Sequence, residues 1–351
     1  MFVPVVDQNQ QPLMPTTPSR ARRWVKEGKA TPFFKRGVFM VRLNREPSDR
    51  KTQPVVVGID PGSKREGFSI LSAAHTFLNV QTVAIDWVGD AMTTRRQMRR
   101  TRRSRKTPCR ANRQNRARGG LPPSTKARWQ WKLRVCWWLK KMFPITAFVV
   151  EDVKAGTKGK RRWDAAFSPL EVGKRWFYEE LSKLGRVTTK QGWETVALRE
   201  QYNLKKSSNK LAETFNAHCV DAWVLANSWM EGQEKPEQTN ILCLTPLRFH
   251  RRQLHRLQPE KGGVRKPYGG TRSLGFKRGS LVKHPKWGLT YVGGHRKDRI
   301  SLHDVTTGKR LTQQAKPEDC RMLTYCSWRY SAPPLTEVKG FRACTTAEIF
   351  L

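Results

Sequence analysis

The chain of 351 residues is long enough for two or three domains with a buried core. Its 68 Lys and Arg residues against 28 Asp and Glu residues give a net charge of +40, which favours a polyanionic partner, above all nucleic acid. No segment approaches the roughly 20 apolar residues that span a bilayer. The N-terminus also lacks the features of a signal peptide, so we expect a cytoplasmic protein with no membrane association. The seven cysteines are scattered, with no pair at zinc-knuckle spacing, so we expect reduced, structural cysteines.

The N-terminal stretch predicts a small unit of strands and one basic helix. Residues 3–6 predict a short apolar strand, and the Pro-Leu-Met-Pro sequence of residues 12–15 predicts a rigid connector. Ser19 is suited to cap a basic helix that ends near Gly28, and residues 39–43 predict a second strand. The arginines of this helix suit phosphate contacts; they are Arg20, Arg22 and Arg23.

Residues 55–60 place a carboxylate at the end of a predicted buried strand. Three valines and an isoleucine come before Asp60, and the turn sequence Pro-Gly-Ser follows it. Such a position suits a metal ligand, although Asp-Pro-Gly is also a common turn sequence. Two further strands are predicted over about residues 67–72 and 82–87, and the second carries Asp86. Short turns between the three strands favour an antiparallel meander.

Residues 91–118 are crowded with arginine and contain almost no large apolar residue. Arginine favours helix, and the spacing places arginines on every face of that helix. Contact with phosphates on several sides would stabilise it, and its position between two domains argues against the alternative of a disordered basic tail. The candidate contacts are Arg95, Arg96, Arg99, Arg100, Arg102, Arg103, Arg105, Arg110 and Arg113.

A second strand repeats the pattern that ends in an acidic residue. After a predicted helix over residues 125–142, residues 145–152 form a buried-strand pattern that runs into Glu151. Ser168 then begins a capping-box sequence and a helix that ends near Gly185.

The last helix of this region carries two polar residues on one face. Weak strand signals at residues 187–189 and 195–196 come first, and the helix is predicted to begin after residue 207 or 208. His218 and Asp221 are three residues apart and so share a helical face. A buried Asp in such a helix requires a partner, which a metal ion would provide. The apolar side of the helix is predicted to contain Leu211, Phe215, Cys219 and Ala222.

The C-terminal region reads as short strands and turns. Residues 231–240 are polar and mark a boundary. Strands are predicted over residues 280–283, 289–294 and 299–303, which suggests a small basic β-barrel or curled sheet. The loops of residues 261–277 are rich in Gly, Arg and Lys, and we expect them to contact nucleic acid rather than only solvent.

Four residues form the candidate catalytic and metal-binding site: Asp60, Glu151, His218 and Asp221. The two strand ends can lie side by side with the last helix packed across them, and acids so close repel one another unless cations lie between them. Two divalent ions about 3.5–4 Å apart would neutralise the cluster and act on a phosphodiester. Mg²⁺ fits because the ligands are hard oxygens. His218 would ligate an ion or position the water.

These motifs resemble those of a known nuclease family. Residues 58–63, 149–151 and 218–222 resemble the three motifs of a split RuvC nuclease, which has an RNase H-like fold. The arginine-rich residues 91–118 resemble the bridge helix of RNA-guided nucleases. Residues 12–15 with the basic helix resemble the PLMP domain of the transposon-encoded IscB group. Between Glu151 and His218 the chain has no room for the HNH nuclease domain of IscB proteins, so it resembles the IsrB variant that lacks this domain.

The resemblance implies an α/β, RNase H-like fold and an RNA-guided, Mg²⁺-dependent DNA endonuclease. A large guide RNA (ωRNA) would pair with the target strand of double-stranded DNA, and the single RuvC site would nick the displaced strand next to a target-adjacent motif. The protein would act as a monomer in a ribonucleoprotein. The implied domains are a PLMP domain (1–53), RuvC part I (54–90), a bridge helix (91–120), RuvC parts II and III (121–235) and a β-rich domain that contacts the target-adjacent motif (236–351).

Two other hypotheses remain open from the sequence. A structure-specific RuvC-like nuclease would use the same site without RNA, but it leaves the internal arginine helix unexplained. A non-catalytic RNA-binding scaffold would treat the acids as structural. Loss of DNA cleavage on Asp60→Ala separates this scaffold hypothesis from the two nuclease hypotheses.

Overall fold

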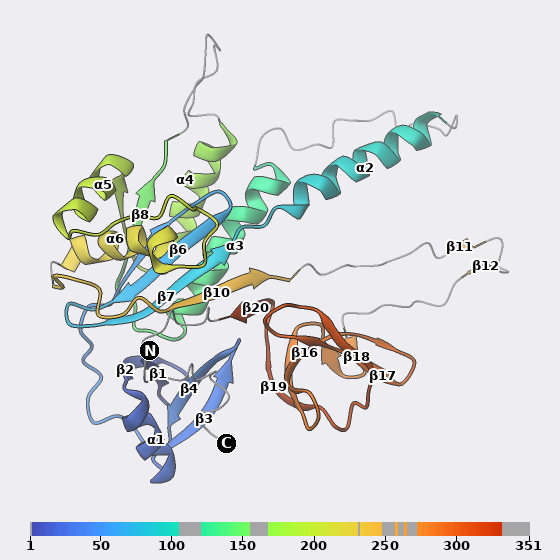
Figure 1. The fold of residues 1–351 in the computed structure, drawn as a ribbon, viewed down its shortest axis with the longest axis horizontal. Helices are drawn as coiled ribbons and strands as arrows, with labels where there is room; N and C mark the ends of the chain where they lie inside the picture. Colours follow the sequence, from blue (N-terminus) through green and yellow to red (C-terminus); the bar gives the residue numbers. More distant parts are fainter. Residues whose placement is uncertain are drawn as a thin grey trace. The chain divides into compact units, whose positions relative to one another are not determined.

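The computed structural model describes residues 2–104, 121–154, 168–230, 232–247, 257–258, 263–264 and 272–331. The chain divides into two compact units (Figure 1). The first is formed mainly by Ser48–Ile241, and the second combines Val3–Gln8 and Thr16–Pro47 with the chain from Leu242 onward.

The centre of the first unit is a mixed sheet whose strands follow the order β7-β6-β5-β8-β9. β5 (Val56–Asp60), β6 (Arg65–Leu71) and β7 (Thr76–Val83) form the predicted antiparallel meander. β8 (Ala147–Asp152) pairs in parallel with β5, and β9 (Arg186–Gln191) pairs in parallel with β8. Three antiparallel strands followed by two parallel strands on the other side of the first strand are the RNase H-like fold that the motifs imply.

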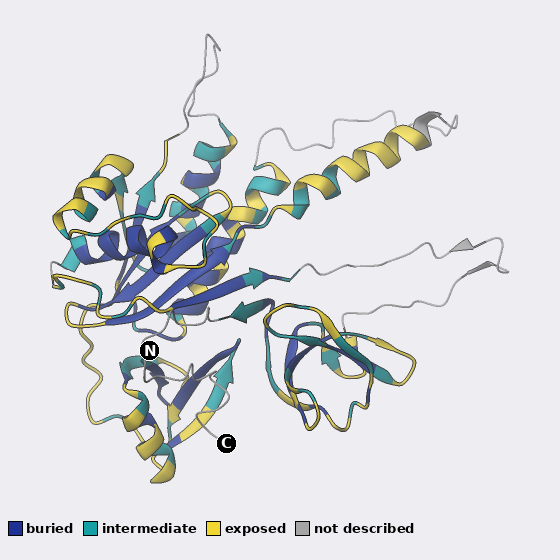
Figure 2. Cartoon of the chain, in the orientation of Figure 1, coloured by how far each residue is buried: buried dark blue, intermediate teal, exposed yellow. Residues whose placement is uncertain are grey.

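Helices cover both faces of this sheet. Neighbouring strand residues point to opposite faces, and β6 shows where each helix lies. The backbone at Gly67 approaches His218, which precedes α6 (Val220–Met230), whereas the carboxylate of Glu66 lies 2.6 Å from the ammonium of Lys132 in α3 (Pro123–Lys140). α4 (Pro169–Ser182) packs against α3, and α5 (Gly192–Gln201) packs against α6. Figure 2 shows the strands buried between these layers.

The prediction of a strand over residues 82–87 is wrong, because β7 ends at Val83. The polar residues of β7 are buried and form hydrogen bonds with loops that are distant in the sequence. The amide of Asn79 donates to the carbonyls of Gln238 and Asn240, at 3.0 and 3.2 Å, and that of Gln81 donates to Ala212 O at 2.9 Å. These hydrogen bonds allow β7 to bury polar side chains beside its apolar ones.

Two further expectations before Asp221 are also wrong. The predicted strand at residues 195–196 is part of α5, whose start is fixed by the Glu194 carboxylate accepting from Gln191 N at 2.6 Å. The helix predicted after residue 207 or 208 begins only with the π-turn η2 (Phe215–Cys219), which leads into α6. The Asn209 side chain accepts from Leu211 N in a local turn, and Leu211 is exposed.

The arginine-rich segment begins as the long helix α2 (Trp87–Ser104), which confirms the helix over its described part. Most of its surface is exposed (Figure 2). Arg105, Arg110 and Arg113 lie outside the described residues.

In the second unit, β1 (Val3–Val6) pairs in parallel with β4 (Val38–Leu43), which forms a hairpin with β3 (Ala30–Lys35). α1 (Pro18–Lys26) is capped by Thr17 rather than by the predicted Ser19, since Pro18 takes the first helical position. Residues 12–15, predicted as a connector, belong to strand β2 (Pro12–Thr16).

The C-terminal part is β-rich, as predicted. Five antiparallel strands follow the order β18-β17-β16-β15-β19 around a core that includes Val282, Val292 and Leu302. Their bounds are β15 (Ser280–His284), β16 (Gly288–Arg296), β17 (Arg299–Asp304), β18 (Arg310–Ala315) and β19 (Arg321–Tyr325). β10 (Ile241–Pro246) pairs with β20 (Trp328–Ser331). Short hairpins join β11 (Leu257–Gln258) to β12 (Gly263–Val264), and β13 (Arg272–Ser273) to β14 (Phe276–Lys277).

Candidate active site

Asp60 and Glu151 are brought together by strand register. Ile59 pairs with Val150 across the parallel β5–β8 ladder, so the next residue of each strand lies at the same edge of the sheet. Asp60 is buried and Glu151 is half-buried. The sequence prediction that the two strand ends lie side by side is therefore confirmed.

The helix that carries Asp221 reaches this edge because two glycines allow close contact. A Cβ on Gly58 would lie 1.7 Å from the Ala222 carbonyl oxygen, and a Cβ on Gly67 would lie 2.3 Å from the His218 carbonyl oxygen. Only residues without a side chain permit this approach. α6 and the π-turn therefore lie directly on β5 and β6, and Asp221 and His218 join Asp60.

His218 is held by hydrogen bonds at both ring nitrogens. Its Nδ1 lies 2.8 Å from Asp60 Oδ2, and its Nε2 lies 3.0 Å from the carbonyl oxygen of Lys210. Both partners are hydrogen-bond acceptors, so this arrangement favours a ring that is protonated on both nitrogens. Burial alone would lower the pKa of His218, but the hydrogen bond and the charge of Asp60 raise it overall. Neither nitrogen offers a lone pair in this arrangement, which favours a role in orienting Asp60; the metal-ligand role stays a prediction.

Asp221 is paired with two cations that the sequence interpretation did not include. The ammonium of Lys206 contacts Asp221 Oδ2, and Arg199 Nε lies 2.9 Å from Oδ1, an ion pair whose angle does not make a hydrogen bond. Burial and the charge of Asp60 raise the pKa of Asp221, against the lowering effect of Lys206 and Arg199. These two residues lie on α5 and in the loop after it, and no strand or helix pattern indicates that they reach the site.

Glu151 shows the strongest electrostatic effect in the cluster. Burial, together with the negative charges of Asp60 and Asp221, raises its pKa to about 7. The ionised carboxylate of Glu151 is therefore disfavoured, first by loss of water and then by its two acidic neighbours. A cation placed beside Glu151 would favour the ionised form.

This arrangement can be tested for its fit to a divalent cation. Asp60, Glu151 and Asp221 offer the hard oxygen donors that Mg²⁺ prefers, and the raised pKa of Glu151 indicates a place for more positive charge. Within the described ranges, however, no three His, Cys, Asp or Glu side chains are arranged as ligands of one ion. The donor chemistry fits Mg²⁺, while Lys206 and His218 engage two of the carboxylates.

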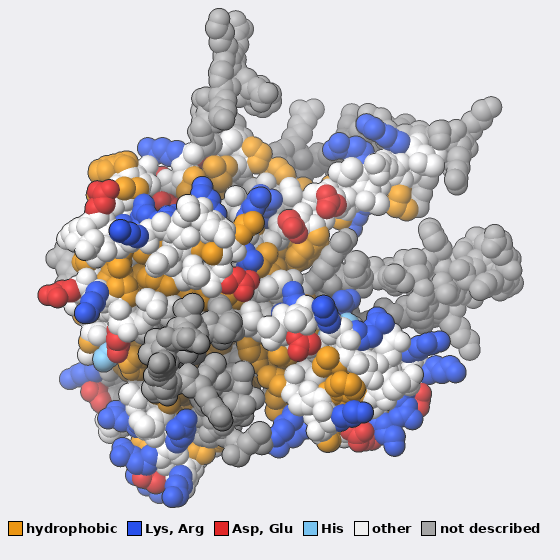
Figure 3. All heavy atoms as spheres, in the orientation of Figure 1, with side chains coloured by type: hydrophobic (Ala, Val, Ile, Leu, Met, Phe, Trp, Pro, Cys, Tyr) orange, Lys and Arg blue, Asp and Glu red, His pale blue; other side chains and the backbone are white. Residues whose placement is uncertain are grey.

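The other predicted residues are not members of this cluster. Asp86 is exposed before α2, and among the described residues it makes no side-chain contact with the acids. Figure 3 shows Lys and Arg side chains spread over the face in view. The described side chains among the predicted nucleic-acid contacts are all exposed: Arg20, Arg22 and Arg23 on α1, and Arg95, Arg96, Arg99 and Arg100 on α2. The side chains of Arg102 and Arg103 lie outside the described part.

No helix in the described part of the chain is long and apolar enough to cross a membrane.

Comparison with known proteins gives one family match. The family model described as RRXRR protein matches residues 3–161, which is less than half of the chain. No curated protein matches the chain.

Two solved structures of RuvC from Thermus thermophilus are similar to part of this chain. The RuvC in complex with a Holliday junction substrate is 13% identical over 50% of this chain and 90% of its own, with a TM-score of 0.28. A second RuvC structure is 14% identical over 51% of this chain and 97% of its own, with a TM-score of 0.24. Scores this low carry no argument about this chain, whose fold is given by its own strand order.

Proposed function

We propose that this protein is an RNA-guided DNA nickase that cuts by phosphodiester hydrolysis. The observation that carries the proposal is the convergence of Asp60, Glu151 and Asp221 at one edge of an RNase H-like sheet. The exposed arginines of α2 and the net charge of +40 support a nucleic-acid partner. The match to the RRXRR family model over residues 3–161 includes this helix.

The residues of the site would divide the chemistry between them. Asp60, Glu151 and Asp221 would hold Mg²⁺ ions, which supply Lewis-acid stabilisation of the charge that develops on the phosphodiester oxygens. His218 orients the Asp60 carboxylate through its Nδ1 hydrogen bond. The ammonium of Lys206 neutralises part of the negative charge of Asp221.

Specificity would come from base pairing rather than from the protein. A guide RNA bound along α2 would pair with the target strand, and the single acid cluster would cut the displaced strand. In this proposal residues 54–90 and 121–235 form the nuclease core, and residues 91–120 form the bridge helix. Residues 1–53 and 236–351 contact nucleic acid, and one copy of the protein acts in each ribonucleoprotein.

The test uses the ribonucleoprotein obtained by co-expression with the flanking non-coding locus. Supercoiled plasmid with a guide-matched target beside randomised flanks is incubated with Mg²⁺, and open circles are expected with the break in the unpaired strand. Glu151→Gln should abolish nicking. The matched control is Asp152→Asn, because the neighbouring Asp152 carboxylate is bonded to Lys174, Tyr178 and Gln191 instead.

Three other results would contradict the proposal in different ways. Linear product would mean a second cutting activity. Cleavage after removal of RNA would favour a structure-specific nuclease. Bound RNA with no cleavage by any variant would favour the scaffold hypothesis.

A further inference from the structure

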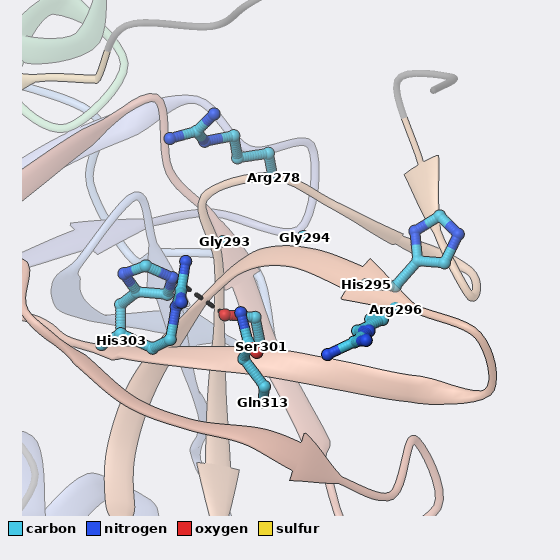
Figure 4. Close-up of a pocket in the computed structure, with 9 residues that line it drawn as sticks. Arg278, Gly293, Gly294, His295, Arg296, Ser301, His303 and Gln313 are labelled. Atoms are coloured by element: carbon cyan, nitrogen blue, oxygen red, sulfur yellow. Dashed lines mark hydrogen bonds between the residues drawn. The ribbon is translucent and has the colours of Figure 1, made fainter. Parts of the chain in front are cut away.

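A pair of glycines interrupts strand β16 of the C-terminal sheet and leaves a hollow there. The pairing of β16 with β17 shifts between Val292 and Gly294, so Gly293 is the extra residue of a β-bulge. A glycine in mid-strand often marks a place where another group approaches the backbone closely. The hollow beside these glycines has a volume of about 230 Å³ (Figure 4).

The hollow is lined by positive charge without any acid. Arg278, Arg296 and Arg310 line it, together with the side chains of His295, Ser301, His303 and Gln313. Within the described ranges none of the three arginines forms an ion pair with an acidic side chain. The nearby acids are engaged elsewhere: Asp298 pairs with Arg299 at 3.4 Å, and Asp304 accepts from the backbone of its own turn.

Arg278 carries a second sign of an unfilled site. Its Nε atom is buried and has no hydrogen-bond partner in the described part of the chain. A buried guanidinium nitrogen without an acceptor is costly. An anion bound to this guanidinium would offset that cost.

One wall of the hollow is rigid because His303 is fixed from three sides. Its Nδ1 lies 3.2 Å from the carbonyl oxygen of Gly308, its Nε2 lies 3.0 Å from Ser301 Oγ, and its ring stacks on Tyr291 at 5.1 Å. Burial lowers the pKa of His303, and the charges of Arg310 and Arg278 lower it further. Both arginines are therefore close enough to act on this ring.

We propose that this hollow binds one phosphodiester group of a nucleic-acid backbone. The three arginines that line the hollow offer guanidinium donors that match phosphate oxygens, and Gly294, where a Cβ would meet no atom within 4 Å, leaves the backbone open for close approach. The inference rests on the nucleic-acid binding in the proposed function, but not on cleavage. The phosphate belongs either to the guide RNA or to the target DNA, and the two have the same chemistry here.

The first test measures how binding depends on salt. Ribonucleoprotein carrying Asp60→Ala binds labelled target duplex, and the protein alone binds labelled guide RNA, both over a series of salt concentrations. Arg296→Ala should weaken binding of one of the two ligands and lower its salt slope by about one. The triple variant with Arg278→Ala and Arg310→Ala should also lower the slope by about one, because the arginines share one phosphate. Arg321→Ala, an exposed arginine of β19 outside the hollow, is the matched control.

The second test uses the two glycines. A Cβ at Gly293 would lie 2.2 Å from His303 Nε2, whereas a Cβ at Gly294 would meet no atom within 4 Å. Gly293→Ala should therefore displace His303 and weaken binding as Arg296→Ala does. Gly294→Ala should also weaken binding, but without disturbing any contact of the protein itself, because its Cβ takes up open space at the site. Melting temperatures of all variants confirm that they fold.

Two outcomes would overturn the proposal. The first is unchanged binding of both ligands by the triple arginine variant. The second is a loss that varies with DNA sequence, which would mean that the arginines contact base edges. Because these tests measure binding with a cleavage-deficient protein, absence of nicking by the wild type would contradict the nickase proposal alone.

Discussion

Lys206 supplies positive charge to a cluster of acids. Its ammonium contacts Asp221, and the charges of Asp60, Asp221 and Glu151 raise its pKa, although burial acts in the opposite direction. An internal cation and a bound metal ion would compete for the same carboxylates. The contact between Lys206 and Asp221 should therefore weaken when a metal ion binds the carboxylates.

Lys206→Met should lower the melting temperature of the metal-free protein, because it leaves a buried carboxylate short of a partner at a cost of about 1–3 kcal/mol. The same change should enlarge the rise in melting temperature that Mg²⁺ produces. Differential scanning fluorimetry with and without Mg²⁺ measures both effects. Lys205→Met, at an exposed neighbouring position, is the control, and an equal response of the two variants would contradict this role of Lys206.

Glu151 gives the site a defined response to pH. Its pKa is about 7 in the folded protein against an ordinary value of 4.5, so the folded state retains a proton that the unfolded state has lost between these values. Unfolding free energy of the metal-free protein should therefore fall as pH rises from about 4.5 to about 7. Mg²⁺ must displace this proton, so Mg²⁺ affinity should rise over the same range. Calorimetric titration on both sides of pH 7 measures the affinity, and an equal pH dependence in Glu151→Gln would contradict the assignment to this residue.

At the residue scale the sequence identifies the acids but not their cations. Asp60 and Glu151 follow apolar runs, so strand periodicity indicates where their carboxylates lie. Arg199 and Lys206 reach Asp221 from α5 and from the loop after it, and loop geometry leaves no periodic pattern in the sequence. The double donation by His218 depends on the Lys210 carbonyl, which only the folded chain places there.

At the scale of elements, the distance between α6 and the sheet is set by Gly58. Gly58→Ala should destabilise the fold by about 1–3 kcal/mol, since the added Cβ would push α6 away from β5. Gly89→Ala in α2 meets no atom within 4 Å and should instead be stabilising, by about 0.5–1 kcal/mol, through helix propensity. Chemical denaturation compares the two variants. Similar midpoints would show that α6 does not depend on this contact.

The boundaries of helices and strands were predictable where the apolar or charged residues follow a simple pattern along the sequence. The core strands β5 and β8 and the basic helix α1 match their apolar or charge patterns closely. β7 did not, because Thr76, Asn79 and Gln81 are buried against loops more than a hundred residues away. Burial of these polar side chains is recognisable only when their distant partners are known. The start of the last helix was missed for a related reason, since Asn209 forms a local turn instead.

At the scale of the whole molecule, the charge of +40 predicts self-repulsion that destabilises the compact state unless a polyanion screens it. Digestion of the RNA that the proposed function implies should therefore lower the melting temperature, and added salt should recover part of the loss by screening repulsion among the basic residues. Thermal unfolding of the intact and digested complexes at two salt concentrations tests this. A melting temperature that is independent of both RNA and salt would contradict it.

The strand order also fixes a sequence of events during synthesis. β5 emerges from the ribosome early, but its parallel neighbour β8 is made only after α2 and α3, and α6 comes later still. Chains fold from the N-terminus as they are made, so Asp60 stands without Glu151 and Asp221 for most of that time. The exposed arginines of α2 are complete well before then. If the protein has the proposed function, a nascent chain would be able to bind its guide RNA before it has assembled the site that would hydrolyse DNA.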